Sequence, residues 1–433
     1  MSFIAPHNNQ SRKTAQVGRP APSKNGEKLL KMAWQKGALC YSRTIQSTYY
    51  VILFSKELEG YFMKITIDRA ALLRALNHVQ SAVERRTTIP ILSNVLMKAE
   101  DGVLSLATTD MDLEINEAVA ANVEKSGATT APAATLFDIV KKLPEDSAVV
   151  LELDGSGNQM TVKAGRSNFR LACLPTTEFP EIGTGNLPTT FSIPANELRA
   201  LIDRTKFAMS TEETRYYLNG IYLHAADNNG VAVLRAVATD GHRLARFEMP
   251  LPDGADGMPG IIIPRKTVGE LRKLVEEAGD AIQVSLSEGK IRFAFDHIVL
   301  TSKLIDGTFP DYQRVIPKNN DKIVEVNPKA FSRAIDRVST ISDGKSRAVK
   351  ISFNGKTMTL SANSPEAGSA TEDLEINGND NMEIGFNAKY LMDITSQIEG
   401  DGCRLTLADA ASPTIIEDAG DSSALYVLMP LRV

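Results

Sequence analysis

The sequence predicts an α+β protein built from three copies of one domain, each with two helices packed on antiparallel sheets. A short alternating strand that runs into an amphipathic helix occurs three times, at Ile65-Thr66-Ile67, Phe191-Ser192-Ile193 and Val324-Glu325-Val326. The three starts are spaced like domains and not like the units of a solenoid. A length of 433 residues also suggests three domains.

The later elements follow in the same order in each copy. Alternating residues around turns predict hairpins at 92–115, 218–247 and 349–376, and apolar periodicity predicts second helices at 134–143, 265–278 and 387–398. Further strands are expected at 160–164, 290–295 and 404–408. The three domains are accordingly placed at 63–184, 190–314 and 320–433.

The first 62 residues differ from the rest of the chain. They carry nine Lys/Arg and three Glu, a net charge of +6, which leaves −11 of the total −5 for residues 63–433. No apolar stretch of signal-peptide length follows the basic residues, which argues against secretion. A disordered basic tail and a mis-assigned start, with Met63 as the working start, both remain open. The second interpretation is favoured.

Composition excludes several classes of protein. The 23% charged residues and the 29 Gly and 20 Pro without a period exclude collagen and extended disorder. Three cysteines, Cys40, Cys173 and Cys403, are too scattered for a metal cage, and the five histidines show no ligand spacing. The longest apolar run, 49–54, is far shorter than the roughly 20 residues that span a bilayer. We expect a soluble protein without a metal or cofactor.

The six predicted helices are rich in basic residues although residues 63–433 are acidic overall. Solvated faces of amphipathic helices would explain any one of them. A repeated arrangement instead suggests a positive surface that faces a polyanion. The residues concerned are Arg69, Arg74, Arg85, Arg86, Lys141, Lys142, Arg199, Arg204, Lys206, Arg265, Lys266, Arg272, Lys273, Lys329, Arg333, Arg337 and Lys389.

The densest polar cluster is 239–244, Thr-Asp-Gly-His-Arg-Leu. Its Asp240 and His242 could be read as a catalytic pair, but no nucleophile is spaced nearby, and Asp and Gly are typical turn residues. The corresponding turn in the first copy is Thr109-Asp110-Met111-Asp112. Because the second copy has gained Gly241, His242 and Arg243, we expect a binding role particular to that domain.

Two further segments invite a functional reading. Arg215-Tyr216-Tyr217 places a cation and two aromatics before a strand, which fits either a half-buried edge or contact with nucleic acid. The C-terminal segment 426–433 continues with apolar residues beyond its alternating strand. Met429, Pro430 and Leu431 could therefore line a groove for an apolar peptide.

These motifs together resemble the bacterial DNA polymerase III β subunits, the replicative sliding clamps. The resemblance covers 63–433 and is most specific at 215–220, 238–245, 309–317 and 427–432. It implies a head-to-tail homodimer whose six domains close into a ring, with twelve helices around the hole. At about 9 Å per helix the hole would be on the order of 25 Å wide, enough for duplex DNA.

The resemblance also implies roles for individual residues. Short apolar peptides of partner proteins would dock between the second and third domains. Arg86, Tyr216 and Tyr217 would contact DNA, and Glu212 stands where some relatives have a neutral amide. Phe169 and Leu171 would meet Thr340 and Ile341 across the subunit interface, where Thr340 replaces an apolar residue. The peptide groove would comprise Leu218, Thr239, Gly241, His242, Arg243, Leu244, Pro310, Arg314, Val315, Tyr390, Val427, Leu428, Met429, Pro430, Leu431 and Arg432.

The resulting hypothesis is a non-catalytic processivity subunit at the nucleoid in the cytoplasm. Its expected partners are a second copy, duplex DNA, the catalytic subunit of DNA polymerase III, the clamp loader, and other polymerases and repair factors. No membrane is expected among them. Two alternatives are a hydrolase that uses Asp240 and His242, and a module that grips open duplex. The net charge of −11 on residues 63–433 argues against simple electrostatic gripping.

Overall fold

The computed structural model describes residues 62–83, 87–183, 185–279, 281–342 and 347–432. The expectations for the N-terminal 61 residues and for Arg86 lie outside the described residues.

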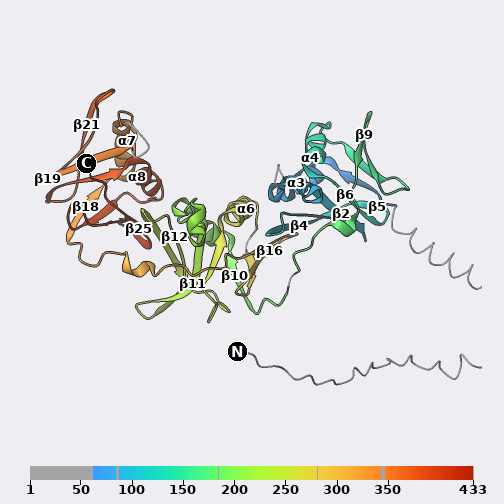
Figure 1. Cartoon of the computed structure of the whole chain (residues 1–433), viewed down its shortest axis with the longest axis horizontal. Coiled ribbons are helices and arrows are strands. Elements are labelled where there is room, and N and C mark those ends of the chain that lie inside the picture. The colour runs from blue at the N-terminus through green and yellow to red at the C-terminus, as the bar shows by residue number, and fades with distance from the viewer. Residues whose placement is uncertain (1–61, 84–86, 184, 280, 343–346, 433) are drawn as a thin grey trace, which may run out of the picture. The chain divides into compact units, whose positions relative to one another are not determined.

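Each copy opens with the expected strand and helix (Figure 1). These are β1 (Lys64–Asp68) with α3 (Arg69–Val79), β10 (Thr189–Pro194) with α5 (Ala195–Asp203), and β18 (Lys322–Val326) with α7 (Pro328–Ser339). In α3 the side chain of Asp68 accepts a hydrogen bond from the Ala71 N–H, and Asn327 caps α7 in the same way through Ala330. Both helices bury one apolar stripe, which fixes them on the sheets.

The hairpins and second helices follow in each copy. The hairpin strands are β2 (Asn94–Glu100), β3 (Val103–Thr109) and β4 (Leu113–Ala120); β11 (Gly220–Asn228), β12 (Val231–Thr239) and β13 (Arg243–Pro250); and β19 (Ala348–Asn354), β20 (Thr357–Ser364) and β21 (Gly368–Glu375). The second helices are α4 (Ala133–Lys142), α6 (Arg265–Val275) and α8 (Ala388–Thr395), which pack on α3, α5 and α7. The remaining strands are β5 (Asn122–Lys125), β6 (Gly127–Pro132), β7 (Ala148–Leu153), β8 (Gln159–Ala164), β9 (Ser167–Ala172), β14 (Ile261–Pro264), β15 (Ala281–Leu286), β16 (Lys290–Phe295), β17 (Ile298–Lys303), β22 (Asn381–Asn387), β23 (Cys403–Leu407), β24 (Thr414–Asp418) and β25 (Asp421–Leu428).

Two helices end earlier than expected. The sequence placed the ends of α6 and α8 near residues 278 and 398, whereas they end at Val275 and Thr395. Their last turns tighten, because the N–H of Ala278 bonds the carbonyl of Val275 and the N–H of Ile398 bonds that of Thr395. Bonds that span three residues satisfy the terminal carbonyls without continuing the α-helix.

The sheets run across the domain boundaries. Strand β17 of the second copy pairs antiparallel with β4 of the first, and β25 of the third pairs with β13 of the second. Each junction therefore merges two half-sheets into one eight-stranded sheet. Strand β9 of the first copy and β21 of the third have no such partner among the described strands and are sheet edges.

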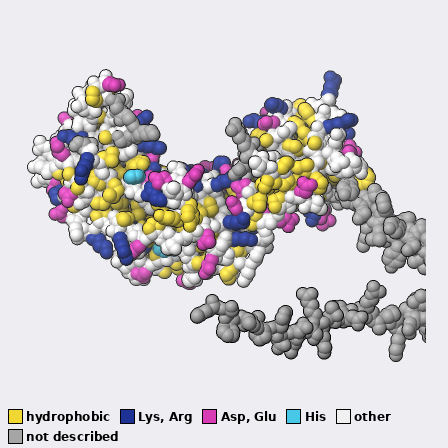
Figure 2. All heavy atoms as spheres, in the orientation of Figure 1, with side chains coloured by type: hydrophobic (Ala, Val, Ile, Leu, Met, Phe, Trp, Pro, Cys, Tyr) yellow, Lys and Arg dark blue, Asp and Glu magenta, His cyan; other side chains and the backbone are white. Residues whose placement is uncertain are grey.

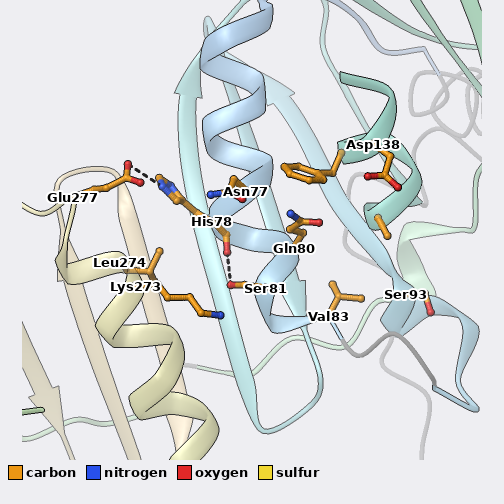
Figure 3. A pocket seen from close by; sticks show the side chains of 12 residues that line it. Asn77, His78, Gln80, Ser81, Val83, Ser93, Asp138, Lys273, Leu274 and Glu277 are labelled. Carbon is orange, nitrogen blue, oxygen red and sulfur yellow. Dashed lines mark hydrogen bonds and ion pairs between the residues drawn. The ribbon is translucent and has the colours of Figure 1, made fainter. Parts of the chain in front are cut away.

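A buried histidine lies at the junction of the first two copies. His78 at the end of α3 is 6% exposed, and its Nδ1 lies 2.8 Å from Glu117 Oε2 on β4. Its Nε2 lies 3.1 Å from Glu277 Oε2, just after α6 (Figure 3). Burial acts to lower the pKa of His78, but the hydrogen bonds and charges of Glu117 and Glu277 outweigh it, so the pKa is raised.

This raised pKa predicts a pH-dependent stability. Protonated His78 stabilises the fold fully below the pKa of an unfolded histidine, about 6.5, and the contribution is lost as pH rises through the folded pKa. We expect the free energy of unfolding, measured in urea, to fall between about pH 6 and about pH 9. The fall should be larger for the native chain than for a His78→Gln variant. His297→Gln, which alters a more exposed histidine beside Glu117, is the control. Equal slopes for native and His78→Gln proteins would contradict the assignment.

Candidate functional site

The polar cluster at 239–244 forms a tight turn between β12 and β13. Asp240 Oδ1 accepts hydrogen bonds from the N–H groups of His242 (2.9 Å) and Arg243 (3.0 Å), and Thr239 Oγ1 accepts one from Gly241 (3.1 Å). Gly241 has φ 87°, and a Cβ there would lie 2.5 Å from Arg215 Nη1. The carboxylate is therefore engaged in turn formation, the structural role that the sequence analysis weighed against a catalytic one.

The first copy contains the same turn. Asp110 Oδ1 accepts from the N–H groups of Asp112 (2.9 Å) and Leu113 (2.7 Å), and Met111 takes the left-handed conformation of Gly241. Asp110 Oδ2 pairs with Lys266 of the second copy. The two turns have the same backbone conformation, but the second oxygen of the Asp carboxylate binds a different partner in each.

In the second copy that oxygen binds Arg243. Arg243 is 7% exposed, and its Nε donates to Asp240 Oδ2 at 3.1 Å. Its Nη1 donates to Asp393 Oδ2 on α8 at 2.6 Å and its Nη2 to the Phe207 carbonyl at 2.6 Å. The guanidinium also lies 4.3 Å from the centroid of the Tyr390 ring. Arg243 thus ties the second copy to the third.

The C-terminal segment also links the second copy to the third. Leu428 pairs with Arg243 in the ladder between β25 and β13. The N–H of Met429 then donates to the His242 carbonyl at 3.0 Å, and the N–H of Leu431 to that of Gly385 at 2.8 Å. Residues 429–431 therefore lie along the turn on one side and β22 on the other.

An apolar cluster separate from the main core lies beside this segment. We call it the junction cluster: Leu218, Val237, Leu244, Ile262, Phe309, Tyr312, Leu425 and Val427. It contains three of the expected groove residues. Val315, three residues after Tyr312, is 51% exposed, and Met429, two residues after Val427, is 41% exposed. Apolar surface is therefore exposed next to a buried apolar cluster.

Other expected groove residues differ in their exposure. His242 is exposed, and its ring stacks with that of Tyr390, with centroids 6.4 Å apart. Leu428 is fully buried in the main core, so only its backbone is near the segment. Thr239, Pro430 and Leu431 are half-buried, and Gly241, Pro310, Arg314 and Arg432 are exposed.

A buried polar network supports the junction cluster, and the sequence analysis missed it. Arg235 Nε donates to Glu248 Oε1 at 2.6 Å, and its Nη1 donates to the Tyr312 hydroxyl at 2.9 Å. His224 Nε2 lies 3.1 Å from the same hydroxyl. Arg235 and Glu248 are directly opposite in the ladder of β12 and β13, which is the signal that could have identified them.

The expected DNA-contacting aromatics have different surroundings. Tyr216 is 52% exposed, whereas Tyr217 packs partly against the junction cluster. Their rings meet edge to face with centroids 5.7 Å apart. Arg215 forms an ion pair of 2.7 Å with Glu212.

Some of the basic residues on the helices form ion pairs with acids, among them Arg272 and Lys273. Arg272 Nε lies 2.8 Å from Asp203 Oδ1 and its Nη1 lies 2.5 Å from Glu276 Oε2. Lys273 similarly pairs with Glu270. On the face shown in Figure 2, basic and acidic side chains are interspersed. The positive helix surface is therefore more neutralised than the count of basic residues suggested.

The described residues contain no group of three or more His, Cys, Asp or Glu placed to hold a metal ion. Among the described helices none has the length and apolarity to cross a membrane. Cys173 and Cys403 are both buried, and burial raises the pKa of Cys403 to about 12, which disfavours the reactive thiolate.

Comparison with known proteins identifies the family. The models of the DNA polymerase III beta subunit match in order, its N-terminal domain at 63–183, its central domain at 192–311 and its C-terminal domain at 313–432. The beta sliding clamp of Caulobacter vibrioides strain NA1000 is 51% identical over 372 residues, which cover 86% of this chain and 100% of the relative. This chain belongs to the DNA polymerase III β subunit family. Its function is that of a DNA sliding clamp.

Other members of the family agree. The beta sliding clamp of Escherichia coli K12 is 38% identical over 375 residues, 86% of this chain and 100% of the relative. The crystal structure of the Caulobacter crescentus clamp matches with a TM-score of 0.85 at 51% identity, covering 87% of this chain and all of that one. A clamp from Bartonella birtlesii bound to griselimycin matches with a TM-score of 0.83 at 50% identity, covering 86% of this chain and all of that one.

The geometry around Arg243 predicts a large stability effect. Replacing Arg243 by Ala removes three hydrogen bonds and leaves Asp240 and Asp393 without their shared cation. We expect the free energy of unfolding in urea to fall by about 3 kcal/mol. Arg314→Ala removes a cation whose side chain is 85% exposed, and should change it by less than about 0.5 kcal/mol. Similar losses for both variants would argue against the tie.

Proposed function

We propose that this clamp acts without catalysis of its own, as a head-to-tail homodimer that encircles duplex DNA in the cytoplasm at the nucleoid. The clamp loader would place it there. The catalytic subunit of DNA polymerase III, other polymerases and repair factors would dock on it. Topological linkage would then provide processivity, while weak phosphate contacts permit sliding.

The repeated junction of half-sheets supports the dimer. Within the chain, the late strand of one copy pairs with the hairpin strand of the copy before it. The late strand of the first copy, β9, and the hairpin strand of the third, β21, lack such a partner among the described strands. Pairing β9 of one subunit with β21 of another is a head-to-tail contact, and a second such contact closes the ring.

The internal repeat also gives a register for this contact. The hairpin pairs Phe295↔Ile298 and Ala164↔Ser167 align β17 with β9. The pairs Val103↔Ala120 and Thr357↔Glu375 align β4 with β21. The junction pair Leu300↔Ile115 then transfers to Phe169 opposite Ala370 of the partner subunit.

The surface beside β9 is suited to such a contact. Phe169 is 38% exposed and lines a hollow of about 320 Å³ together with Ile139 and Leu143. Thr340 and Ile341, which follow α7, would face this hollow from the other subunit. Leu171 is buried in its own domain, so its contribution would be smaller than that of Phe169.

The junction cluster and residues 429–431 support a docking site for apolar peptides. Exposed Met429 and Val315 near a buried cluster would allow one or two large side chains to be buried on binding. In the crystal structure of the C. crescentus clamp, polyethylene glycol is bound to a region proposed to tether the β-motif. A hydrolase based on Asp240 and His242 has less support, because turn and ion-pair contacts engage both carboxylate oxygens.

The test of the proposed function is retention on DNA after loading. A nicked circular plasmid is compared with the same plasmid linearised, in salt high enough to screen phosphate contacts. We expect the clamp to persist on the circle and to leave the linear DNA within the same wash. Equal retention on both would indicate a module that grips open duplex, and equal loss from both would mean that no ring closes around DNA.

Deletion of residues 429–433 tests the docking site. It removes the exposed Met429 side chain and the backbone bonds to His242 and Gly385. Binding of a labelled peptide with the apolar docking motif of the polymerase catalytic subunit should weaken at least about 100-fold, measured by fluorescence anisotropy. The dimer, measured by sedimentation, should persist. Ile323→Ser, a change of an exposed apolar residue on β18, is the control, and unchanged affinity of the deletion would refute the assignment.

A further inference from the structure

A basic residue occupies the same position in or just after the first helix of each copy. His78, Arg204 and Arg337 each lie ten residues after the N-cap of their helix, at Asp68, Pro194 and Asn327. At both junctions within the chain this basic residue contacts the next copy. His78 Nε2 lies 3.1 Å from Glu277 Oε2, on the segment after α6 (Figure 3).

Arg204 makes the corresponding contact at the second junction. Its Nη1 donates to the Gln397 carbonyl at 2.7 Å, and its Nη2 lies 3.2 Å from Glu399 Oε2. Both acceptors are on the segment after α8, the equivalent of the segment after α6. At each junction the segment after the second helix of the next copy thus presents an acceptor to the basic residue of the preceding copy.

The third copy has a basic residue at the same position. Arg337 donates through Nε to Glu372 Oε2 on β21 at 2.9 Å, as His78 pairs with Glu117 on β4. Its side chain nevertheless remains 59% exposed. His78 and Arg204, in contrast, are buried.

The first copy carries the matching acceptor. Glu277 lies thirteen residues after the N-cap of α6 at Pro264, and Glu145 lies thirteen residues after the N-cap of α4 at Pro132. Glu145 is exposed and lies two residues after Leu143, which lines the hollow together with Phe169. We propose that Arg337 pairs with Glu145 of the partner subunit, so that the contact found at both internal junctions is completed at each subunit interface. This inference rests on the proposed head-to-tail ring.

The pairing has a consequence for ring opening. Arginine stays charged throughout the physiological pH range, so the subunit contact should respond to salt and not to pH, unlike the His78 contact. Both partners are exposed in the separate subunit. The interface that must open would therefore hold this contact more weakly than the junction around buried Arg204.

A double-mutant cycle on the full chain tests the pair. The dissociation constant of the dimer is measured by sedimentation for native protein, Arg337→Gln, Glu145→Gln and the double variant. Because each ring contains two such pairs, we expect Glu145→Gln to raise the dissociation constant about tenfold at low salt. In the Arg337→Gln background the same change should have almost no effect. Arg337→Gln also removes the bond to Glu372, and this cost is common to both arms of the cycle.

Asp146→Asn is the matched control. It removes the same charge from the next residue, and Asn tolerates the φ of 57° found there. Its effect should be small and independent of Arg337. Additive effects of Arg337→Gln and Glu145→Gln, or coupling of Arg337 to Asp146 alone, would overturn the proposal while leaving the ring intact. A native chain that stays monomeric at every concentration would instead refute the ring itself.

Discussion

The pairing of half-sheets between successive copies is the constraint on which the structure depends. Strands β17 and β4, and β25 and β13, share backbone hydrogen bonds across domain boundaries, so neither half-sheet is complete within one copy. Unpaired backbone groups on a sheet edge favour pairing with another strand. The same requirement that joins copies within the chain leaves β9 and β21 without such a partner among the described strands.

One turn shows how a repeated structure acquires different tasks. Asp110 and Asp240 each accept hydrogen bonds within the turn before the strand that pairs with the next copy. In the first copy the free carboxylate oxygen binds Lys266 of the next domain, which closes the junction directly. In the second copy it holds Arg243, and Arg243 in turn reaches Asp393. Because an arginine has several donors, it can fix the turn, α8 and a loop carbonyl at once.

The electrostatics are consistent with loose contact to a polyanion. Several helical cations are paired with acids one turn away, as Arg272 is with Glu276, and this weakens the field that they present. A protein that grips DNA gains affinity by releasing counterions from many phosphates. A clamp that is retained by topology does not need that affinity, and partial neutralisation would favour sliding.

The sequence by itself determined the three copies, their element order and the resemblance to sliding clamps, because hydrophobic periodicity, turn residues and spacing are local properties of the chain. It also identified the turn at 239–244 and the apolar C-terminus as candidate sites. Only the tertiary structure decided that Leu428 is buried while Met429 is exposed, and that Arg243 meets Asp393 150 residues away. Those outcomes depend on which strands of different copies pair and in which register. No local pattern encodes that choice, since every hairpin strand in the repeat could in principle accept every late strand.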